Sequence, residues 1–423
     1  MAISRNVASI IVLEVFWAFG VTFVSFDIIS AFIYSMEGGA WLVALASTVS
    51  CLLLYAPQIL VPYFQQRVTH PVGGSALGQA FIVAGYTLMA ITLATTHSRP
   101  ILLTMVVTVV GMHALGNAFA YPFYQQLRLR LFPSRTRSAS YSTVLFFSQI
   151  AGTVGAALSI PLLNAGGGPT QRNYFWCFVV ASVLGAIASL CFAFMRDPAP
   201  TPEPAVSVRP LSDFLAESVK IFRGDGNLRA FVVSEWMNWL SSMGSTFITF
   251  YAVGLFGEFI AAECNFVRVL GAILAVPIAH LVVSRISARA AIITFYLCSI
   301  ALYLVLLLPP ARWMILFATF LVGCAVVFRV NYMFHYVTGI CPHDNKSTYY
   351  AICNTAVSPI TVIGPLLGGL FVNILGGYRP VFAVAIAPLL VGLFLAWKVL
   401  KDPIAPSEEI SVVPRVALKR MTN

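Results

Sequence analysis

The stretch VASIIVLEVFWAFGVTFVSFDIISAFIY, residues 7–34, is an almost unbroken apolar run in which Glu14 and Asp27 are the only charged residues. A helix needs about 20 mainly apolar residues to cross the hydrocarbon core of a bilayer. The run is too long for the apolar region of a secretory signal, and it lacks a clear small-residue cleavage site. We therefore predict that it holds the first of several membrane spans.

The overall composition agrees with a chain whose main solvent is lipid. Of its 423 residues, 59% are hydrophobic and only 9% are charged, whereas a soluble domain carries about 25% charged residues. The net charge of +10 does not indicate nucleic acid, because the basic residues cluster in short segments between apolar runs. Such clusters are typical of segments that set the orientation of a membrane protein. The sequence predicts no nucleic-acid partner.

The sequence contains no motif for enzymatic or metal chemistry. Its eight cysteines are scattered without a CxxC pair, which is typical of small buried residues. It has no GxxxxGKS or GxxxxGKT loop for a nucleotide and no HExxH for a metal. We expect no enzyme, no catalytic residue, no metal and no cofactor. Energy would come from an ion gradient or from the gradient of the solute itself.

Twelve apolar runs are long enough to span a bilayer, six on each side of one polar stretch. We predict spans near 8–35, 39–63, 76–96, 100–126, 141–163, 174–195, 230–256, 259–283, 290–309, 312–338, 348–374 and 380–400. The fold class is therefore an all-α integral membrane protein with two six-helix bundles. Its predicted parts are an N-terminal bundle (1–195), a cytoplasmic linker (196–229), a C-terminal bundle (230–400) and a cytoplasmic tail (401–423).

The linker has two parts of different composition. It opens with PAPTPEP (198–204), whose prolines cannot continue a helix. It goes on as LSDFLAESVKIF (211–222). The apolar residues of this second part fit one stripe: Phe214, Leu215, Val219 and Phe222. An amphipathic helix at the membrane surface explains the stripe, and a partly ordered linker fits the segment equally.

Lysine and arginine are strongly biased to one side of the predicted membrane. With the N-terminus inside, the cytoplasmic segments hold nineteen of them and the outer loops hold four. The remaining two, Arg268 and Arg329, fall inside spans. This bias predicts a multi-pass protein of the plasma (inner) membrane with both termini in the cytoplasm.

The two halves of the chain repeat each other weakly. At an offset of 209 residues, FPSRTRSASYS (132–142) matches CPHDNKSTYYA (341–351) in its proline, a basic residue, a serine and a tyrosine. Glu14 and Glu235 lie at similar places near the starts of the first and seventh spans. Repeated halves recur in secondary transporters.

Twelve spans in two repeated halves resemble the major facilitator superfamily over nearly the whole chain. That family carries a GxLaDrxGrr motif after spans two and eight, where this chain reads PYFQQRVTHP (62–71) and HLVVSRISAR (280–289). The basic positions survive as Arg67, Arg285 and Arg289, which the resemblance makes gate residues, and the acidic position is replaced in both copies. The resemblance also implies a monomer whose central cavity is lined by spans one, four, seven and ten, with help from five and eleven.

Ionisable residues inside the predicted spans are costly in lipid and need a reason. Glu235, Glu14 and Asp27 are candidate proton-coupling sites, since a carboxylate partly removed from water holds protons more tightly. Positions at the membrane interface are the alternative. Arg329 lies deep in span ten and cannot lose its charge. It either forms a fixed salt bridge with Glu235 or Glu14, or it grips a carboxylate or phosphate of the solute.

Other polar residues recur on one helix face, as in the stripe of span seven from Glu235 to Thr249. In lipid, such faces must meet protein or a water-filled cavity. The candidates for lining the cavity are His113, Asn117, Asn238, Trp239, Ser242, Arg329, Asn331, Tyr350, Asn354 and Ser358. For each of them, an interhelical hydrogen bond without solute contact is the alternative.

These features predict a secondary transporter of a small organic solute, proton-coupled or facilitative, that works by alternating access. Arg329 favours an anionic solute, and the aromatics near Glu14 and Glu235 suit a bulkier, partly apolar one. A multidrug/proton antiporter that exports hydrophobic compounds is the alternative with the same fold. A membrane receptor or an intramembrane enzyme is the alternative of another class. The expected partners are the solute, protons and the lipid bilayer.

Overall fold

The computed structural model describes residues 5–65, 71–131, 137–166, 169–195, 210–341 and 346–402. Within these ranges it consists of helices joined by short turns, and twelve spans are long and apolar enough to cross a membrane. Each span begins and ends within a few residues of its predicted bounds. The described chain is thus the predicted all-α, twelve-span membrane protein.

Three of the first six spans contain a 3-10 segment. The first consists of α1 (Arg5–Val21), a 3-10 turn η1 (Thr22–Val24) and α2 (Phe26–Ser35). The second consists of α3 (Ala40–Tyr55), η2 (Ala56–Ile59) and α4 (Leu60–Gln65). The others are α5 (Pro71–Thr95), α6 (Arg99–Leu131), α7 (Arg137–Asn164) and α8 (Gln171–Leu190), which η3 (Cys191–Phe194) extends.

The second six spans follow the short helix α9 (Leu211–Gly224). The seventh span is again divided, into α10 (Gly226–Ser245) and α11 (Ile248–Phe256). The remaining five are α12 (Ile260–Arg285), α13 (Ala288–Leu307), α14 (Arg312–Ile340), α15 (Lys346–Ile374) and α16 (Tyr378–Lys398).

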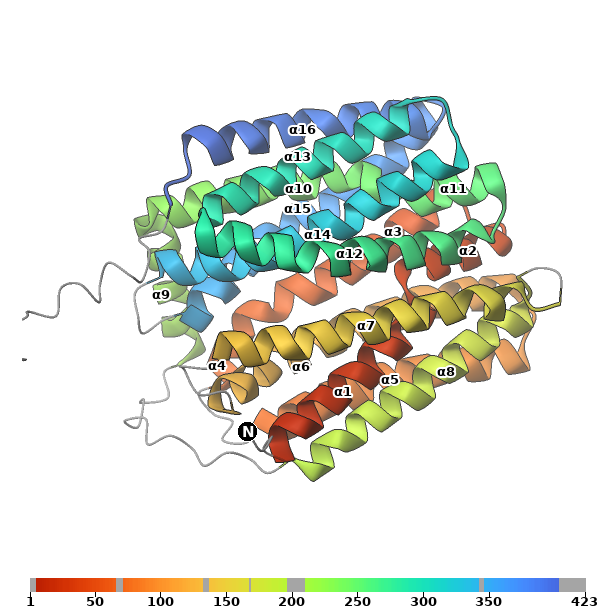
Figure 1. Cartoon of the computed structure of the whole chain (residues 1–423), viewed down its shortest axis with the longest axis horizontal. Helices are drawn as coiled ribbons and strands as arrows, with labels where there is room; N and C mark the ends of the chain where they lie inside the picture. The colour runs from red at the N-terminus through yellow and green to blue at the C-terminus, as the bar shows by residue number, and fades with distance from the viewer. Residues whose placement is uncertain are drawn as a thin grey trace, which may run out of the picture.

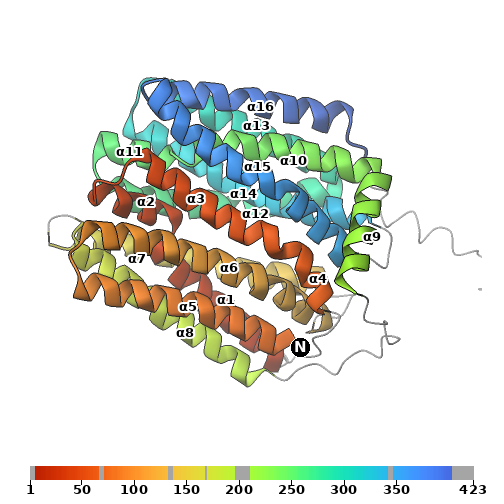
Figure 2. The same cartoon turned by 180° about the vertical axis from the view of Figure 1, so that it is seen from behind.

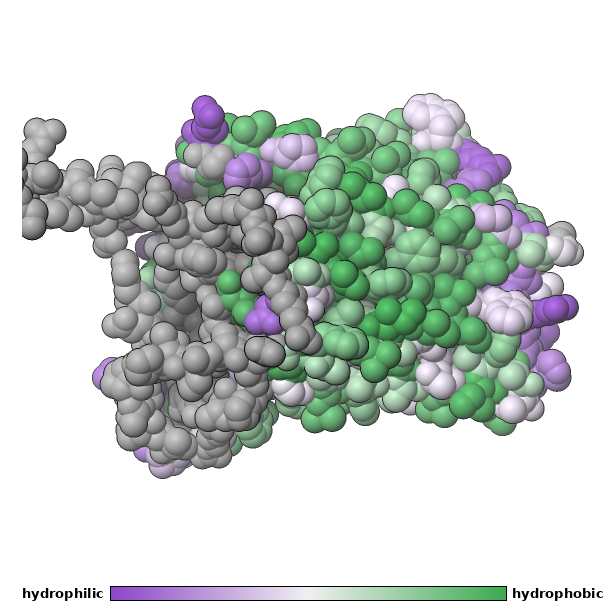
Figure 3. Space-filling model, turned by 60° about the horizontal axis from the view of Figure 1, so that its bottom comes forward, coloured by the Kyte–Doolittle hydropathy of each residue, from purple (hydrophilic) through white to green (hydrophobic). Residues whose placement is uncertain are grey.

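The helices run roughly parallel, with α1 and α5–α8 on one side and α10 and α13–α16 on the other (Figures 1 and 2). The two sides are joined where α3, η2 and α4 pack on α15, where α7 packs on α12, and where α2 packs on both α11 and α12. On the face shown in Figure 3, apolar residues cover the body of the molecule and hydrophilic residues gather toward its two ends. This distribution is that of a multi-pass membrane protein.

The divided first and seventh spans bend at the same depth. Ser25 has an extended backbone (ψ 159°) between η1 and α2, and Phe247 (φ −104°, ψ 0°) separates α10 from α11. The outer pieces α2 and α11 pack together at the end of the molecule away from α9 (Figure 1). The breaks therefore allow these two short helices to turn toward each other.

Glycines allow the spanning helices to approach closely at several crossings. A Cβ on Gly323 of α14 would lie 1.9 Å from the carbonyl oxygen of Arg268 on α12. A Cβ on Gly364 or Gly368 of α15 would lie 2.3 or 2.2 Å from a carbonyl oxygen of α10. These contacts are typical of small residues at helix interfaces in membranes.

Helix α9 lies across the end of the bundle where α1 begins and α16 ends (Figures 1 and 2). The sequence predicted one apolar stripe, but the apolar residues divide between two faces. Phe214 is 4% exposed and packs on Tyr63 of α4, with 6.1 Å between ring centroids. Leu215 and Val219 are 36% and 49% exposed. The helix exists as predicted, and its buried face lies against the bundle.

Candidate functional site

The most deeply buried charge cluster joins α10 to α14. The Nε and Nη2 atoms of Arg329 donate to Oε2 of Glu235 at 3.1 and 3.0 Å. The Tyr332 hydroxyl donates to Oε1 of the same carboxylate at 2.5 Å. Glu235 is 1% exposed, whereas 19% of the Arg329 side chain is exposed. The carboxylate is thus fully enclosed, and the arginine side chain is partly exposed.

Both partners lie well inside their membrane-spanning helices. Helix α10 begins at Gly226, four residues before the predicted start, so Glu235 is deeper than the sequence analysis placed it. At 1.5 Å per residue, Glu235 is about 14 Å from the start of α10, and Arg329 is about 16 Å from the end of α14. Of the two alternatives considered for Arg329, the structure shows the salt bridge with Glu235.

Aromatic rings surround the exposed side of this pair. The Arg329 guanidinium carbon lies 4.8 Å from the ring centroid of Trp239, and Tyr55 packs edge-on against Trp239 at 5.2 Å. The guanidinium also lies close to Tyr55. Tyr350 lies close to both Tyr55 and Arg329. We refer to Glu235, Arg329, Tyr332, Trp239 and Tyr55 as the central cluster.

The sequence analysis missed Tyr55, because a single tyrosine in an apolar span gives neither a charge nor a periodic signal. The available signal was Pro57, two residues later, which starts the 3-10 turn η2. Tyr55 is the member of the central cluster that comes from the first half of the chain.

The first half contains a related cluster between α1 and α6. Glu14 forms a salt bridge with Arg128, whose guanidinium carbon lies 4.4 Å from the ring centroid of Tyr124. Glu14 lies on α1 and Glu235 lies on α10, which are the first pieces of the first and seventh spans. Each half thus joins an acid on its first span to an arginine on its fourth, and the predicted similarity of the two glutamates extends to their partners.

The third candidate acid, Asp27, is in a different kind of position. It is 3% exposed, accepts a hydrogen bond from Thr249 of α11 and forms a salt bridge with Arg268 of α12. Asn265 of α12 also donates to the carbonyl oxygen of Thr22 at 2.9 Å. We call these contacts the far seam, because they close the gap between the halves at the end away from α9.

The stripe predicted for span seven does not line a single cavity. Because α10 ends at Ser245, Thr249 belongs to α11 and to the far seam. Asn238 lies 3.5 Å from the Glu235 carboxylate. Ser242 donates to the carbonyl oxygen of Trp239 on its own helix at 2.6 Å. The part of the stripe that faces the central cluster is therefore the part nearer the start of α10, with Glu235 and Asn238.

The other cavity candidates have diverse partners. His113 lies 2.5 Å from the Tyr86 hydroxyl and stacks on Trp17 at 6.3 Å. The amides of Asn117 and Asn331 donate to carbonyl oxygens one turn back on their own helices. These two asparagines thus use part of their hydrogen-bonding capacity within their own spans.

Two candidates on α15 are buried. Asn354 donates to Gln58 of η2 at 2.6 Å, and the backbone oxygen of Ser358 accepts from Thr361. Among the predicted gate residues, Arg285 is exposed and Arg289 donates to the carbonyl oxygen of Ala396 at 2.9 Å. The prediction for Arg67 lies outside the described residues.

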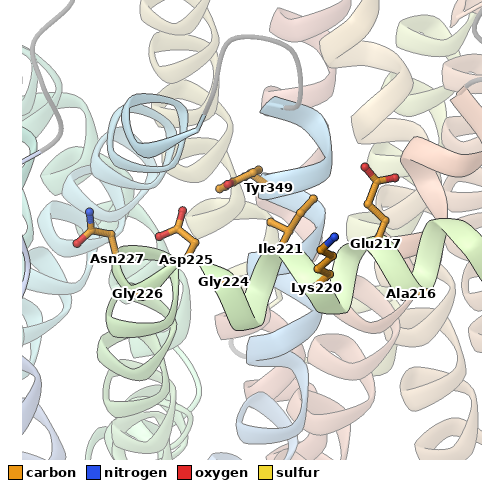
Figure 4. Close-up of a pocket in the computed structure, with 9 residues that line it drawn as sticks. All are labelled: Ala216, Glu217, Lys220, Ile221, Gly224, Asp225, Gly226, Asn227 and Tyr349. Atoms are coloured by element: carbon orange, nitrogen blue, oxygen red, sulfur yellow. The ribbon is translucent and has the colours of Figure 1, made fainter.

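A cleft of about 960 Å³ lies between α9 and the first turn of α15, at the α9 end of the molecule (Figure 4). Its polar side chains include Glu217, Lys220, Asp225 and Tyr349. It is a surface feature away from the central cluster. Within the described residues, no group of three or more His, Cys, Asp or Glu side chains is arranged to hold a metal.

Comparisons with known proteins agree with this architecture. The family model described as Major Facilitator Superfamily matches residues 264–420. No curated protein matches the chain in sequence.

Solved structures with the same fold include three transporters. The nucleoside transporter NupG has a TM-score of 0.71 at 9% identity and covers 92% of this chain and 98% of its own. The E. coli fucose:proton symporter FucP has a TM-score of 0.63 at 12% identity, covering 92% and 97%. The human organic anion transporter TETRAN has a TM-score of 0.61 at 14% identity, covering 93% and 99%. The family model thus matches part of the second half of the chain, and the described residues share the fold of these solved transporters.

Proposed function

We propose that the chain is a proton-coupled transporter of a small organic anion that works by alternating access between its two halves. The observation that carries the proposal is the pair of Glu235 and Arg329 at mid-depth. Its acid is enclosed and its arginine side chain is partly exposed. A mid-membrane ionisable pair is costly and marks substrate or proton pathways in transporters.

The two partners offer a physical means of coupling. While Glu235 is ionised, it neutralises Arg329, and the site carries no net charge for an anion to meet. A proton on Glu235 removes that neutralisation and leaves a guanidinium that needs an anion, because arginine does not deprotonate in proteins. A proton and one negative charge on the solute therefore enter together without leaving an unpaired charge in lipid.

The surroundings of the guanidinium define the expected solute. Its planar fork of donors fits a carboxylate or phosphate with two parallel hydrogen bonds. The rings of Trp239 and Tyr55 beside it suit an apolar or aromatic body on the same molecule. FucP couples fucose to protons and TETRAN carries organic anions, so this fold can accommodate both parts of the proposal.

We place the α9 end of the molecule in the cytoplasm of a plasma (inner) membrane protein, with both termini on that side, because the basic residues concentrate there. The far seam then closes the outer side. In the proposed cycle, a monomer opens this seam to load solute and proton, and then closes it to release them inside.

The binding step can be tested on purified protein in detergent. Small carboxylates and their neutral amides are screened for a rise in melting temperature, first on wild type and then on Arg329→Lys. We expect at least one carboxylate to stabilise the wild type at mildly acidic pH and its amide to have no effect. Arg329→Lys should weaken that binding about tenfold or more, because lysine lacks the two-pronged geometry.

The outcomes separate this function from its alternatives. Stabilisation by hydrophobic drugs and not by carboxylates would favour the multidrug antiporter. In liposomes, recovery of a chemically altered solute would favour an enzyme. Equal binding by Arg329→Lys would remove the arginine from solute recognition.

A further inference from the structure

The lower part of the second span makes three separate contacts with other parts of the molecule. At the top, Tyr55 meets Arg329 and Trp239. One turn below, Gln58 accepts a hydrogen bond from Asn354 of α15 at 2.6 Å. Below that, Tyr63 packs on Phe214 of α9. A single short stretch thus connects the central cluster with the α9 end of the molecule.

The local chemistry gives this stretch some independence from α3 above it. The helix changes from α to 3-10 geometry at Ala56, and Pro57 lies in the first turn of the new segment. Proline removes a backbone donor and disturbs the helix before it. We call residues 56–65, which comprise η2 and α4, the gate segment.

The contact between Gln58 and Asn354 closes the two halves against each other below the central cluster. The two residues are 8% and 4% exposed. A buried amide left without its partner costs free energy. When the α9 side opens, the two amides must therefore exchange their mutual hydrogen bond for hydrogen bonds to water. Breaking it requires the gate segment to move away from α15.

We infer that Tyr55 is the positioning residue through which occupancy of Arg329 controls the gate segment. This inference rests on the proposed function. Two donors of the guanidinium are held by Glu235, and Tyr55 and the guanidinium both lie against the ring of Trp239, close to each other. A carboxylate that binds with two parallel hydrogen bonds needs the remaining donors. Solute therefore displaces Tyr55, and the gate segment loses its uppermost attachment to the C-terminal half.

Cys51 provides a probe for this device. It lies one turn above Tyr55 on the same helix, is partly buried and is close to Arg329. We propose a full-length variant that keeps Cys51 as its only cysteine, reconstituted in vesicles with the α9 side outward. The rate at which a small charged methanethiosulfonate reagent modifies Cys51 then reports opening of the gate segment, and it requires no solute.

Tyr55→Phe keeps the ring against Trp239 and removes the hydroxyl oxygen, which is the polar atom of Tyr55 that can interact with the charge of Arg329. We expect Cys51 to react at least tenfold faster in this variant, because the interaction of this oxygen with a charged group is lost only from the closed state. Gln58→Ala should accelerate the reaction similarly by breaking the bond to Asn354. Tyr34→Phe is the matched control, since Tyr34 packs on Phe250 at the opposite end of the bundle.

The inference is overturned if Gln58→Ala accelerates the reaction and Tyr55→Phe leaves it within twofold of the parent. It is also overturned if neither variant accelerates it, or if Tyr34→Phe accelerates it as much as Tyr55→Phe. Faster labelling in both test variants, together with no binding of any carboxylate, would support the gate and reject the anion function. The two failures are therefore distinguishable.

Discussion

At the scale of single residues, the three candidate acids differ in what their salt bridges join. Glu14 and Glu235 each bind an arginine within their own half, whereas Asp27 binds Arg268 across the two halves. Rocking of two rigid bundles leaves contacts within each bundle intact and breaks those between them. Asp27 therefore belongs to the closure of the far seam, and the two glutamates remain candidates for proton binding.

Removing Arg329 should destabilise the protein because the buried Glu235 would lose its partner. We expect Arg329→Ala to lower the free energy of unfolding by about 3–5 kcal/mol, the usual cost of breaking a buried pair from one side. The double variant Arg329→Ala with Glu235→Gln should recover most of this loss. Thermal unfolding of the three proteins in detergent checks the prediction. A double variant as unstable as the single one would show that the pair does not determine stability.

Glu258, at the end of the molecule away from α9, should make the stability of the protein depend on pH. It lies in the turn between α11 and α12, and Tyr174 donates to it at 3.3 Å. Burial raises the pKa of this carboxyl above its ordinary value of 4.5, although the bond from Tyr174 opposes the rise. The folded state therefore holds the proton more tightly than the unfolded state. Stability should fall as pH rises from about 4.5 through the raised pKa.

The variant Glu258→Gln removes this titrating carboxyl. It should therefore not show the part of the stability loss with rising pH that Glu258 causes. We expect the melting temperature of Glu258→Gln minus that of the wild type to increase with pH above about 4.5 and then level off. Comparing the two proteins cancels the contribution of other titrating groups. A difference that shrinks as pH rises would contradict the assignment.

At the scale of helices, the sequence predicted the existence of the spans better than their internal breaks. Apolar length is a property of each run, so it could be read directly. The break at Phe247 was missed because the polar stripe continues through it, and Thr249 was therefore placed in the wrong group. Helix α9 was predicted as an element, but which of its faces is buried depends on contacts such as that of Phe214 with Tyr63.

The crossing of α12 and α14 should not tolerate a methyl group. A Cβ at Gly323 would lie 1.9 Å from a carbonyl oxygen, and a backbone atom can move only with its helix. We expect Gly323→Ala to cost about 1–3 kcal/mol, as is usual for overpacking. Gly73→Ala is the control, since a Cβ there would meet nothing within 4 Å. The two melting temperatures test this, and equal values would refute the close approach.

At the scale of the whole molecule, composition and the lengths of the apolar runs predicted the class and the number of spans, and both are confirmed for the described residues. The resemblance to the major facilitator superfamily agrees with the family model over residues 264–420. The relative placement of the halves could not be predicted, because it depends on a few contacts between residues far apart in the sequence, such as Asn354 with Gln58 and Asp27 with Arg268. The partner of Glu14 was missed because Arg128 lies in a basic cluster that looked cytoplasmic. The loops of the sequence repeat lie largely outside the described residues.

Accumulation driven by a proton gradient tests the central claim most directly. Wild type, Glu235→Gln and Arg329→Ala are reconstituted in liposomes that are more acidic outside, and uptake of the best-binding carboxylate is followed to its plateau. The wild type should concentrate the solute above its external level. Glu235→Gln should bind and equilibrate the solute without concentrating it, because the glutamine side chain cannot take up and release a proton. Arg329→Ala should transport none. Undiminished accumulation by Glu235→Gln would contradict the proposed coupling.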